Sequence, residues 1–141
     1  TLLEPRAQVL QRLGSRHVLV VHARDGLDEI SIGAETEVAE LNDGAIRRYR
    51  IGPEDFGLPR SGLDAIRVPD PAASLAMLRG VLADRPGPAR DIVLLNAGAA
   101  IYAAGRGDSL ASGVRLADAA ITSGEAQRRL AALVALTQGM N

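Results

Sequence analysis

The spacing of apolar residues at the start of the chain predicts a helix followed by a buried strand. Apolar residues recur at helical spacing over residues 3–13, and Pro5 stands in the first turn of that helix. Residues 16–23 then contain Val18-Leu19-Val20-Val21, an apolar run without alternation. Such a run is typical of a strand that is covered on both faces.

Two stretches of alternating residues predict a β-hairpin. Residues 36–41 and 45–51 alternate between polar and apolar side chains, and Asn42-Asp43-Gly44 between them supplies turn residues. We expect this hairpin to have one wet face.

The second half of the chain is predicted to be helical after a surface connection over residues 52–71, where proline, glycine and aspartate interrupt any regular pattern. Helices are expected over residues 74–82, 89–104, 109–122 and 125–138. Small residues at 96–100 leave little bulk on the second of these helices, which indicates close packing against another backbone. The element order predicts an α/β fold with a mixed sheet flanked by helices.

Charge and aromatic content argue against a nucleic-acid-binding protein. Sixteen basic residues balance seventeen acidic ones, for a net charge of −1, and only 2% of the residues are aromatic. Base stacking needs aromatic side chains, and binding to a phosphate backbone needs an excess of basic residues, and this composition provides neither.

The chain has no cysteine, which excludes disulfides and thiol catalysis and fits a reducing cytoplasm. No uninterrupted apolar stretch approaches the roughly 20 residues of a membrane span. We therefore expect a cytoplasmic protein without a membrane partner.

The clearest candidate chemistry follows the first predicted strand. Asp28 and Glu29 are adjacent carboxylates beyond its carboxyl end, where open α/β sheets bind ligands, and Gly26 allows a sharp turn before them. Neighbouring side chains diverge, so the pair suits one metal per carboxylate, or one metal with the second carboxylate acting through water, better than a chelate. Hard oxygen ligands favour Mg²⁺ or Mn²⁺, and Mg²⁺ commonly takes one or two carboxylates plus substrate phosphates.

Simpler interpretations of these residues remain open. An Asp-Gly-x-Asp-Glu loop also fits a solvated turn in which Asp28 or Glu29 caps a short helix. His22 fits a general base or a phosphate donor, but more readily a satisfied structural histidine. His17 is expected to be exposed where the strand begins. Residues 106–108 offer an anion site at a helix N-terminus or, more simply, a plain N-cap, and Asp108-Ser109 supplies N-cap residue types.

Residues 19–31, which read Leu-Val-Val-His-Ala-Arg-Asp-Gly-Leu-Asp-Glu-Ile-Ser, resemble the metal-binding segment of the anthranilate phosphoribosyltransferase family. The similarity continues in the same order through residues 36–41, 53–58, 94–100 and 108–113. It implies the α/β domain of the nucleoside phosphorylase and phosphoribosyltransferase type.

The resemblance also implies an activity. Phosphoribose would pass from phosphoribosyl pyrophosphate to anthranilate in tryptophan biosynthesis, with release of pyrophosphate. Asp28 and Glu29 match the family's metal ligands, the cofactor would be Mg²⁺, and no protein nucleophile is required. The full-length protein is expected to be a homodimer.

Several family motifs have no counterpart in this sequence. The glycine-rich phosphate loop, the diphosphate-binding segment, the Lys-His-Gly loop and the anthranilate-contacting arginine belong upstream of Thr1, so the residues that bind substrate stay unknown. Ala23 also replaces the glycine that usually follows the histidine. We expect residues 1–141 to form one partial catalytic domain, inactive alone, without the N-terminal helical domain.

Two other functions stay open. A pyrimidine-nucleoside phosphorylase relative would share the fold but lack this acidic metal loop. A non-catalytic relative that binds nucleic acid or a protein partner would carry a basic surface stripe.

Overall fold

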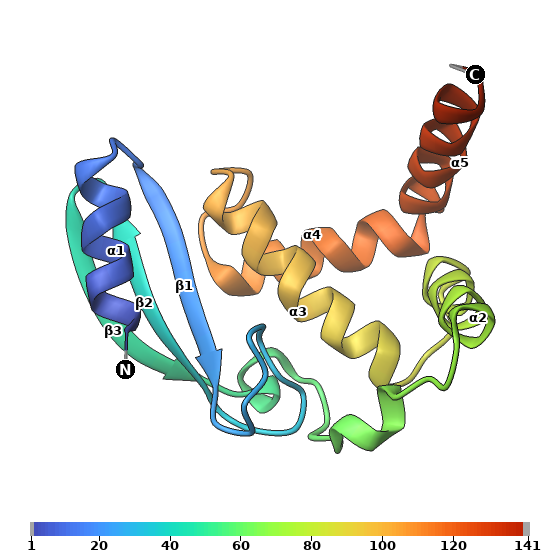
Figure 1. The fold of residues 1–141 in the computed structure, drawn as a ribbon, viewed down its shortest axis with the longest axis horizontal. Helices are drawn as coiled ribbons and strands as arrows, with labels where there is room; N and C mark the ends of the chain where they lie inside the picture. The colour runs from blue at the N-terminus through green and yellow to red at the C-terminus, as the bar shows by residue number, and fades with distance from the viewer. Residues whose placement is uncertain (1, 140–141) are drawn as a thin grey trace.

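The computed structural model describes residues 2–139, and its elements follow the predicted order (Figure 1). This confirms the predicted α/β fold. The helices and strands are α1 (Leu3–Arg12), β1 (His17–Ala23), β2 (Thr36–Asn42), β3 (Ala45–Ile51), the 3₁₀ helices η1 (Pro53–Phe56) and η2 (Leu63–Ile66), α2 (Pro71–Leu82), α3 (Pro88–Ala103), α4 (Leu110–Thr122) and α5 (Glu125–Gln138).

The strands form one antiparallel sheet in the order β1-β2-β3. Val20 pairs with Ala39, and Val38 pairs with Tyr49, and both strand pairs are antiparallel. Within residues 2–139 the sheet is therefore not the predicted mixed one, because each strand is joined to the next by a loop that reverses the chain and not by a crossover helix. The apolar run of β1 is only half-buried, and the expectation of full cover on both faces was wrong for this chain. The physical reason is position, because β1 is an edge strand while β2 lies in the centre.

Helices cover both faces of the sheet (Figure 1). On one face, α1 buries Leu3 and Ala7 against Ala39. On the other face, Val38 and Ile51 join a larger core that includes residues of α3 and α4, namely Leu94, Leu95, Val114, Ala117 and Ile121. The central strand β2 is thus largely buried on both sides, and the wet face predicted for the hairpin is confined to β3.

Helix α2 begins earlier than its apolar spacing predicts. The Asp70 side chain accepts a hydrogen bond from the backbone N–H of Ala73 at 2.7 Å, and Pro71 occupies the first helical position. A proline there removes no helical hydrogen bond. The interpretation of Pro71 as part of an irregular connection was therefore wrong.

Helices α3 and α4 approach each other through glycine. A Cβ atom built on Gly98 would lie 2.6 Å from the backbone nitrogen of Val114, and one built on Gly113 would overlap the carbonyl oxygen of Gly98. The predicted close packing of the small residues in α3 is confirmed. Further along the chain, Ser109 caps α4 through the backbone N–H of Ser112 at 3.1 Å, which is the plain N-cap expected there.

A buried carboxylate ties the sheet to α3. Glu40 of β2 is 4% exposed and accepts hydrogen bonds from Tyr102 Oη at 2.7 Å, Tyr49 Oη at 2.9 Å and His17 Nε2 at 3.0 Å. Burial raises the pKa of the Glu40 carboxyl, but the bonds from Tyr102, Tyr49 and His17 outweigh it and hold the pKa below the ordinary 4.5. His17 is part of this network and partly buried, so its predicted exposure was wrong.

Among residues 2–139, no helix is both long and apolar enough to cross a membrane.

The glycine contact between α3 and α4 can be tested with Gly113→Ala. Alanine favours a helix over glycine by about 1 kcal/mol, whereas overpacking a core costs about 1–3 kcal/mol. Because the added methyl group overlaps the Gly98 carbonyl, we expect a net loss of about 1–2 kcal/mol in the free energy of unfolding, measured by urea denaturation. Gly62→Ala is the matched control, since its Cβ meets nothing within 4 Å. Equal stability of the two variants would contradict the proposed overlap.

The Glu40 network predicts a pH-dependent stability. A carboxyl whose pKa is lowered by folding stabilises the native state above its unfolded pKa, and this contribution is lost as the pH falls through the folded pKa. Glu40→Gln should therefore cost about 1–3 kcal/mol near neutral pH, and the difference from the parent protein should shrink below about pH 4.5. Urea titrations across this range measure both effects. A difference that stays constant with pH would contradict the role of the ionised carboxylate.

Candidate functional site

The loop that joins β1 to β2 begins with a tight turn. Gly26 has a φ of +93°, a conformation that side chains disfavour, and the Ala23 N–H donates to the carbonyl oxygen of Leu27 at 3.0 Å. The predicted sharp turn at Gly26 is therefore confirmed. Arg24 adds an ion pair with Glu35, at 3.2 Å, where the loop closes.

The Asp25 side chain accepts a hydrogen bond from within the same loop. Ser31 Oγ donates to Asp25 Oδ2 at 2.6 Å and accepts from the Gly33 N–H at 2.8 Å. Ser31 is fully buried, and its own N–H donates to Thr36 Oγ1 at 3.1 Å. A side chain at Gly33 would place Cβ only 3.0 Å from Asp25 Oδ2. These contacts fold the second half of the loop back onto its beginning.

Asp28 and Glu29 are exposed, and within residues 2–139 neither side chain makes a hydrogen bond or an ion pair. They lie between half-buried Leu27 and Ile30, which is 2% exposed. The loop thus holds its apolar residues inward and leaves these two carboxylates without a protein partner. Of the three acids at positions 25, 28 and 29, only Asp25 is engaged.

The donor set fits a hydrated Mg²⁺ ion. The described residues contain no cluster of three or more histidine, aspartate or glutamate side chains around a common point, so the chain itself offers at most the two carboxylates here. Mg²⁺ usually keeps several waters and adds one or two carboxylates and substrate phosphate oxygens, which matches two free and exposed acids. A fully protein-enclosed metal site is not what these residues build.

Asn96 is a site residue that the sequence analysis missed, because its segment was interpreted only as packing. It lies in the middle of α3, and its side-chain amide is bonded to the backbone of Ile30, directly after Glu29. The available signal was a polar residue inside an apolar helical stretch, which needs a partner when it is partly buried.

His22 is exposed at the end of β1 and makes no hydrogen bond within the described part of the chain. The interpretation as a satisfied structural histidine was therefore wrong. A role as a base or phosphate donor stays a prediction. His22 lies near the end of β1, just before the loop over residues 24–35 that carries Asp28 and Glu29, which we call the acidic loop.

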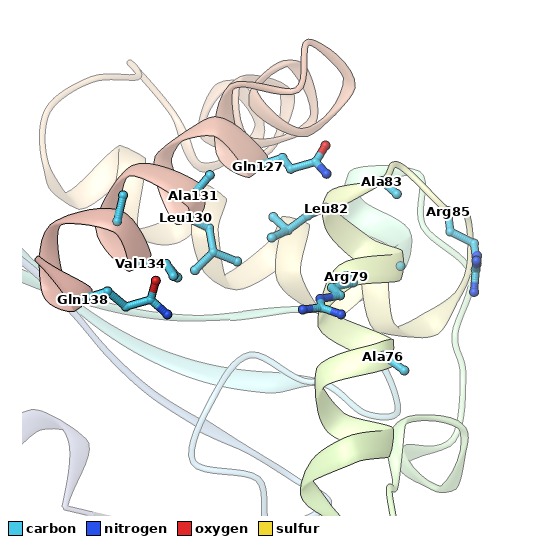
Figure 2. Close-up of a pocket in the computed structure, with 12 residues that line it drawn as sticks. Ala76, Arg79, Leu82, Ala83, Arg85, Gln127, Leu130, Ala131, Val134 and Gln138 are labelled. Atoms are coloured by element: carbon cyan, nitrogen blue, oxygen red, sulfur yellow. The ribbon is translucent and has the colours of Figure 1, made fainter.

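A groove of about 630 Å³ lies elsewhere, between α2 and α5 (Figure 2). Leu82 of α2 and Leu130 of α5 point toward each other across it, and Arg79 and Arg85 add positive charge. No carboxylate lines this groove, so it cannot supply the metal ligands. The candidate metal site and the groove are separate features of the molecule.

Comparison with known proteins gives the chain its relatives. It is 63% identical over 135 residues to the anthranilate phosphoribosyltransferase of Thioalkalivibrio sulfidiphilus, and 59% identical over 136 residues to that of Methylococcus capsulatus. Each alignment covers 96% of this chain and 40% of the relative. The chain therefore spans about 40% of the length of the curated relatives it matches.

Solved structures share the fold. The crystal structure of the Thermus thermophilus anthranilate phosphoribosyltransferase matches with a TM-score of 0.85 at 41% identity, over 95% of this chain and 39% of that one. The Saccharomyces cerevisiae enzyme in complex with PRPP and Mg matches with a TM-score of 0.78 at 22% identity, over 90% of this chain and 37% of that one, a likeness of fold alone.

The family model described as "Glycosyl transferase family, a/b domain" matches residues 1–127, which include the whole acidic loop, the sheet, and helices α1 to α4. The chain belongs to this glycosyl transferase family.

Proposed function

We propose that this chain is the part of an anthranilate phosphoribosyltransferase that carries its metal-binding carboxylates. The observation that supports this most strongly is the pair Asp28 and Glu29, exposed and without a protein partner beyond the carboxyl end of β1. Relatives of that name are 63% and 59% identical over nearly the whole chain. The reaction is transfer of phosphoribose from phosphoribosyl pyrophosphate to the amine of anthranilate, with release of pyrophosphate.

The acidic residues of this chain would contribute to catalysis by holding a metal cation beside the substrate. Asp28 and Glu29 would hold Mg²⁺, which neutralises charge on the departing diphosphate as the bond to the ribose C1 breaks. The Asp25–Ser31 bond at 2.6 Å keeps the loop folded, so the two free acids start from a fixed backbone. No side chain of the loop has to attack the substrate.

The proposal also covers the domain to which the site belongs, the location of the enzyme and its assembly. Residues 1–141 form part of one catalytic α/β domain, and the activity also requires a phosphate loop and a helical domain that these residues do not contain. The complete enzyme acts in the cytoplasm on phosphoribosyl pyrophosphate and anthranilate, and it assembles as a homodimer.

The charges on β3 favour an enzyme over a nucleic-acid-binding relative. Arg48 forms ion pairs with Glu4 and Glu37, and Arg50 with Glu35 and Glu37, at 3.5–4.0 Å. These arginines are therefore partly neutralised by neighbouring acids. Phosphate binding along a duplex relies on basic side chains that are available to the ligand.

A chimera tests the proposal directly. This chain replaces the matched 135 residues of the Thioalkalivibrio sulfidiphilus enzyme, and formation of phosphoribosylanthranilate is measured with Mg²⁺. We expect the chimera to be active and Asp28→Asn with Glu29→Gln to lower kcat/KM roughly 100-fold or more, because a metal contributes several kcal/mol to charge stabilisation. The melting temperature should hardly change, since both side chains are exposed.

Asp64→Asn is the matched control, because this aspartate is 92% exposed and contacts only Arg67 in the described chain. It should leave kcat/KM unchanged. Full activity of the double variant would refute the assignment of Asp28 and Glu29. Phosphorolysis of thymidine by the chimera, without transfer to anthranilate, would support the phosphorylase alternative.

A further inference from the structure

The side chain of Asn96 pairs with the backbone of Ile30 on both sides of that residue. The Ile30 N–H donates to Asn96 Oδ1 at 2.9 Å, and Asn96 Nδ2 donates to the Ile30 carbonyl oxygen at 2.9 Å. The second proton of Nδ2 goes to the carbonyl oxygen of Ile92, one turn earlier in α3, at 3.0 Å. The amide of Asn96 therefore has one fixed orientation.

This pairing fixes the downstream end of the dipeptide that carries the free acids. Upstream, Leu27 is held by its carbonyl oxygen, which accepts from the Ala23 N–H at 3.0 Å. Between Leu27 and Ile30, the side chains of Asp28 and Glu29 have no anchor of their own within residues 2–139. Their position thus depends on the two backbone contacts that flank them.

The contact also links the loop to α3, a helix that packs closely against α4. Asn96 lies two residues before Gly98, where α3 meets α4 backbone to backbone. Ile30 itself is 2% exposed and belongs to the same apolar core as Leu95. An apolar side chain at position 96 would leave the Ile30 N–H and carbonyl groups without this partner.

We propose that Asn96 is a positioning residue for the candidate metal site, acting through the backbone of Ile30 to hold in place the dipeptide that carries Asp28 and Glu29. This inference rests on the proposed function, and it deepens it by naming the residue that orders the ligands. Partners that orient metal ligands typically contribute 10- to 100-fold in metal affinity.

The test measures, in the same variants, the affinity for a metal ion and the rate of hydrogen exchange at the Ile30 amide. Mn²⁺ is titrated into the chimera described above, alone and with inorganic pyrophosphate, and free Mn²⁺ is followed by electron paramagnetic resonance. Hydrogen exchange of the Ile30 amide is measured in parallel. Asn96→Ala removes all three hydrogen bonds, and Asn96→Leu removes them while keeping most of the side-chain volume.

We expect both variants to weaken Mn²⁺ binding roughly 10-fold or more and to speed exchange at Ile30. Ser109→Ala is the control for general destabilisation, because it removes the N-cap hydrogen bond of α4. Ser109 makes no hydrogen bond to residues 24–35 in the described chain. This variant should bind Mn²⁺ like the parent chimera.

Two results separate the two proposals. Unchanged Mn²⁺ affinity in both Asn96 variants, with faster exchange at Ile30, would overturn the positioning role and leave the proposed function intact. Absence of Mn²⁺ binding in the parent chimera, or binding that survives Asp28→Asn with Glu29→Gln, would overturn both.

Discussion

The backbone contact between α3 and α4 at Gly98 and Gly113 is the constraint on which the polar contacts of α3 with the rest of the molecule depend. It fixes α3 in place, and α3 in turn reaches the two other parts of the molecule with polar side chains. Asn96 reaches the loop after β1, and Tyr102 reaches the buried Glu40 in the centre of the sheet. A shift of α3 would therefore disturb the acidic loop and the sheet together.

Local patterns in the sequence predicted the elements well, because each element carries its own signals. Helical spacing, the Asn42-Asp43-Gly44 turn and the Ser109 cap all act over a few residues. The errors concern sequence signals with two meanings. Proline is common both in irregular connections and at the first position of a helix, and Pro71 occupies the second of these places. The apolar run of β1 is typical of a fully covered strand, but this chain leaves β1 at the edge of its sheet.

The polar contacts of the candidate site were less predictable, because their partners are distant in sequence. Asn96 is 66 residues from Ile30, and Tyr102 is 62 residues from Glu40. No local pattern pairs such residues, and for the same reason the exposures of His17 and His22 were assigned the wrong way round. Asp28 and Glu29 were identified because they are adjacent carboxylates directly after a predicted strand, and the resemblance to a known segment supported that choice. That their side chains have no partner within residues 2–139 is visible only in three dimensions.

The pairing between Asn96 and Ile30 recognises a peptide group and not a side chain. Substitution of Ile30 by another apolar residue would therefore leave the contact intact. Proline at position 30 would remove it, because proline has no backbone N–H to donate to Asn96. Position 96 should tolerate almost no substitution, since only a carboxamide of this length supplies one acceptor and two donors together. Two touching positions should thus evolve at very different rates within the family.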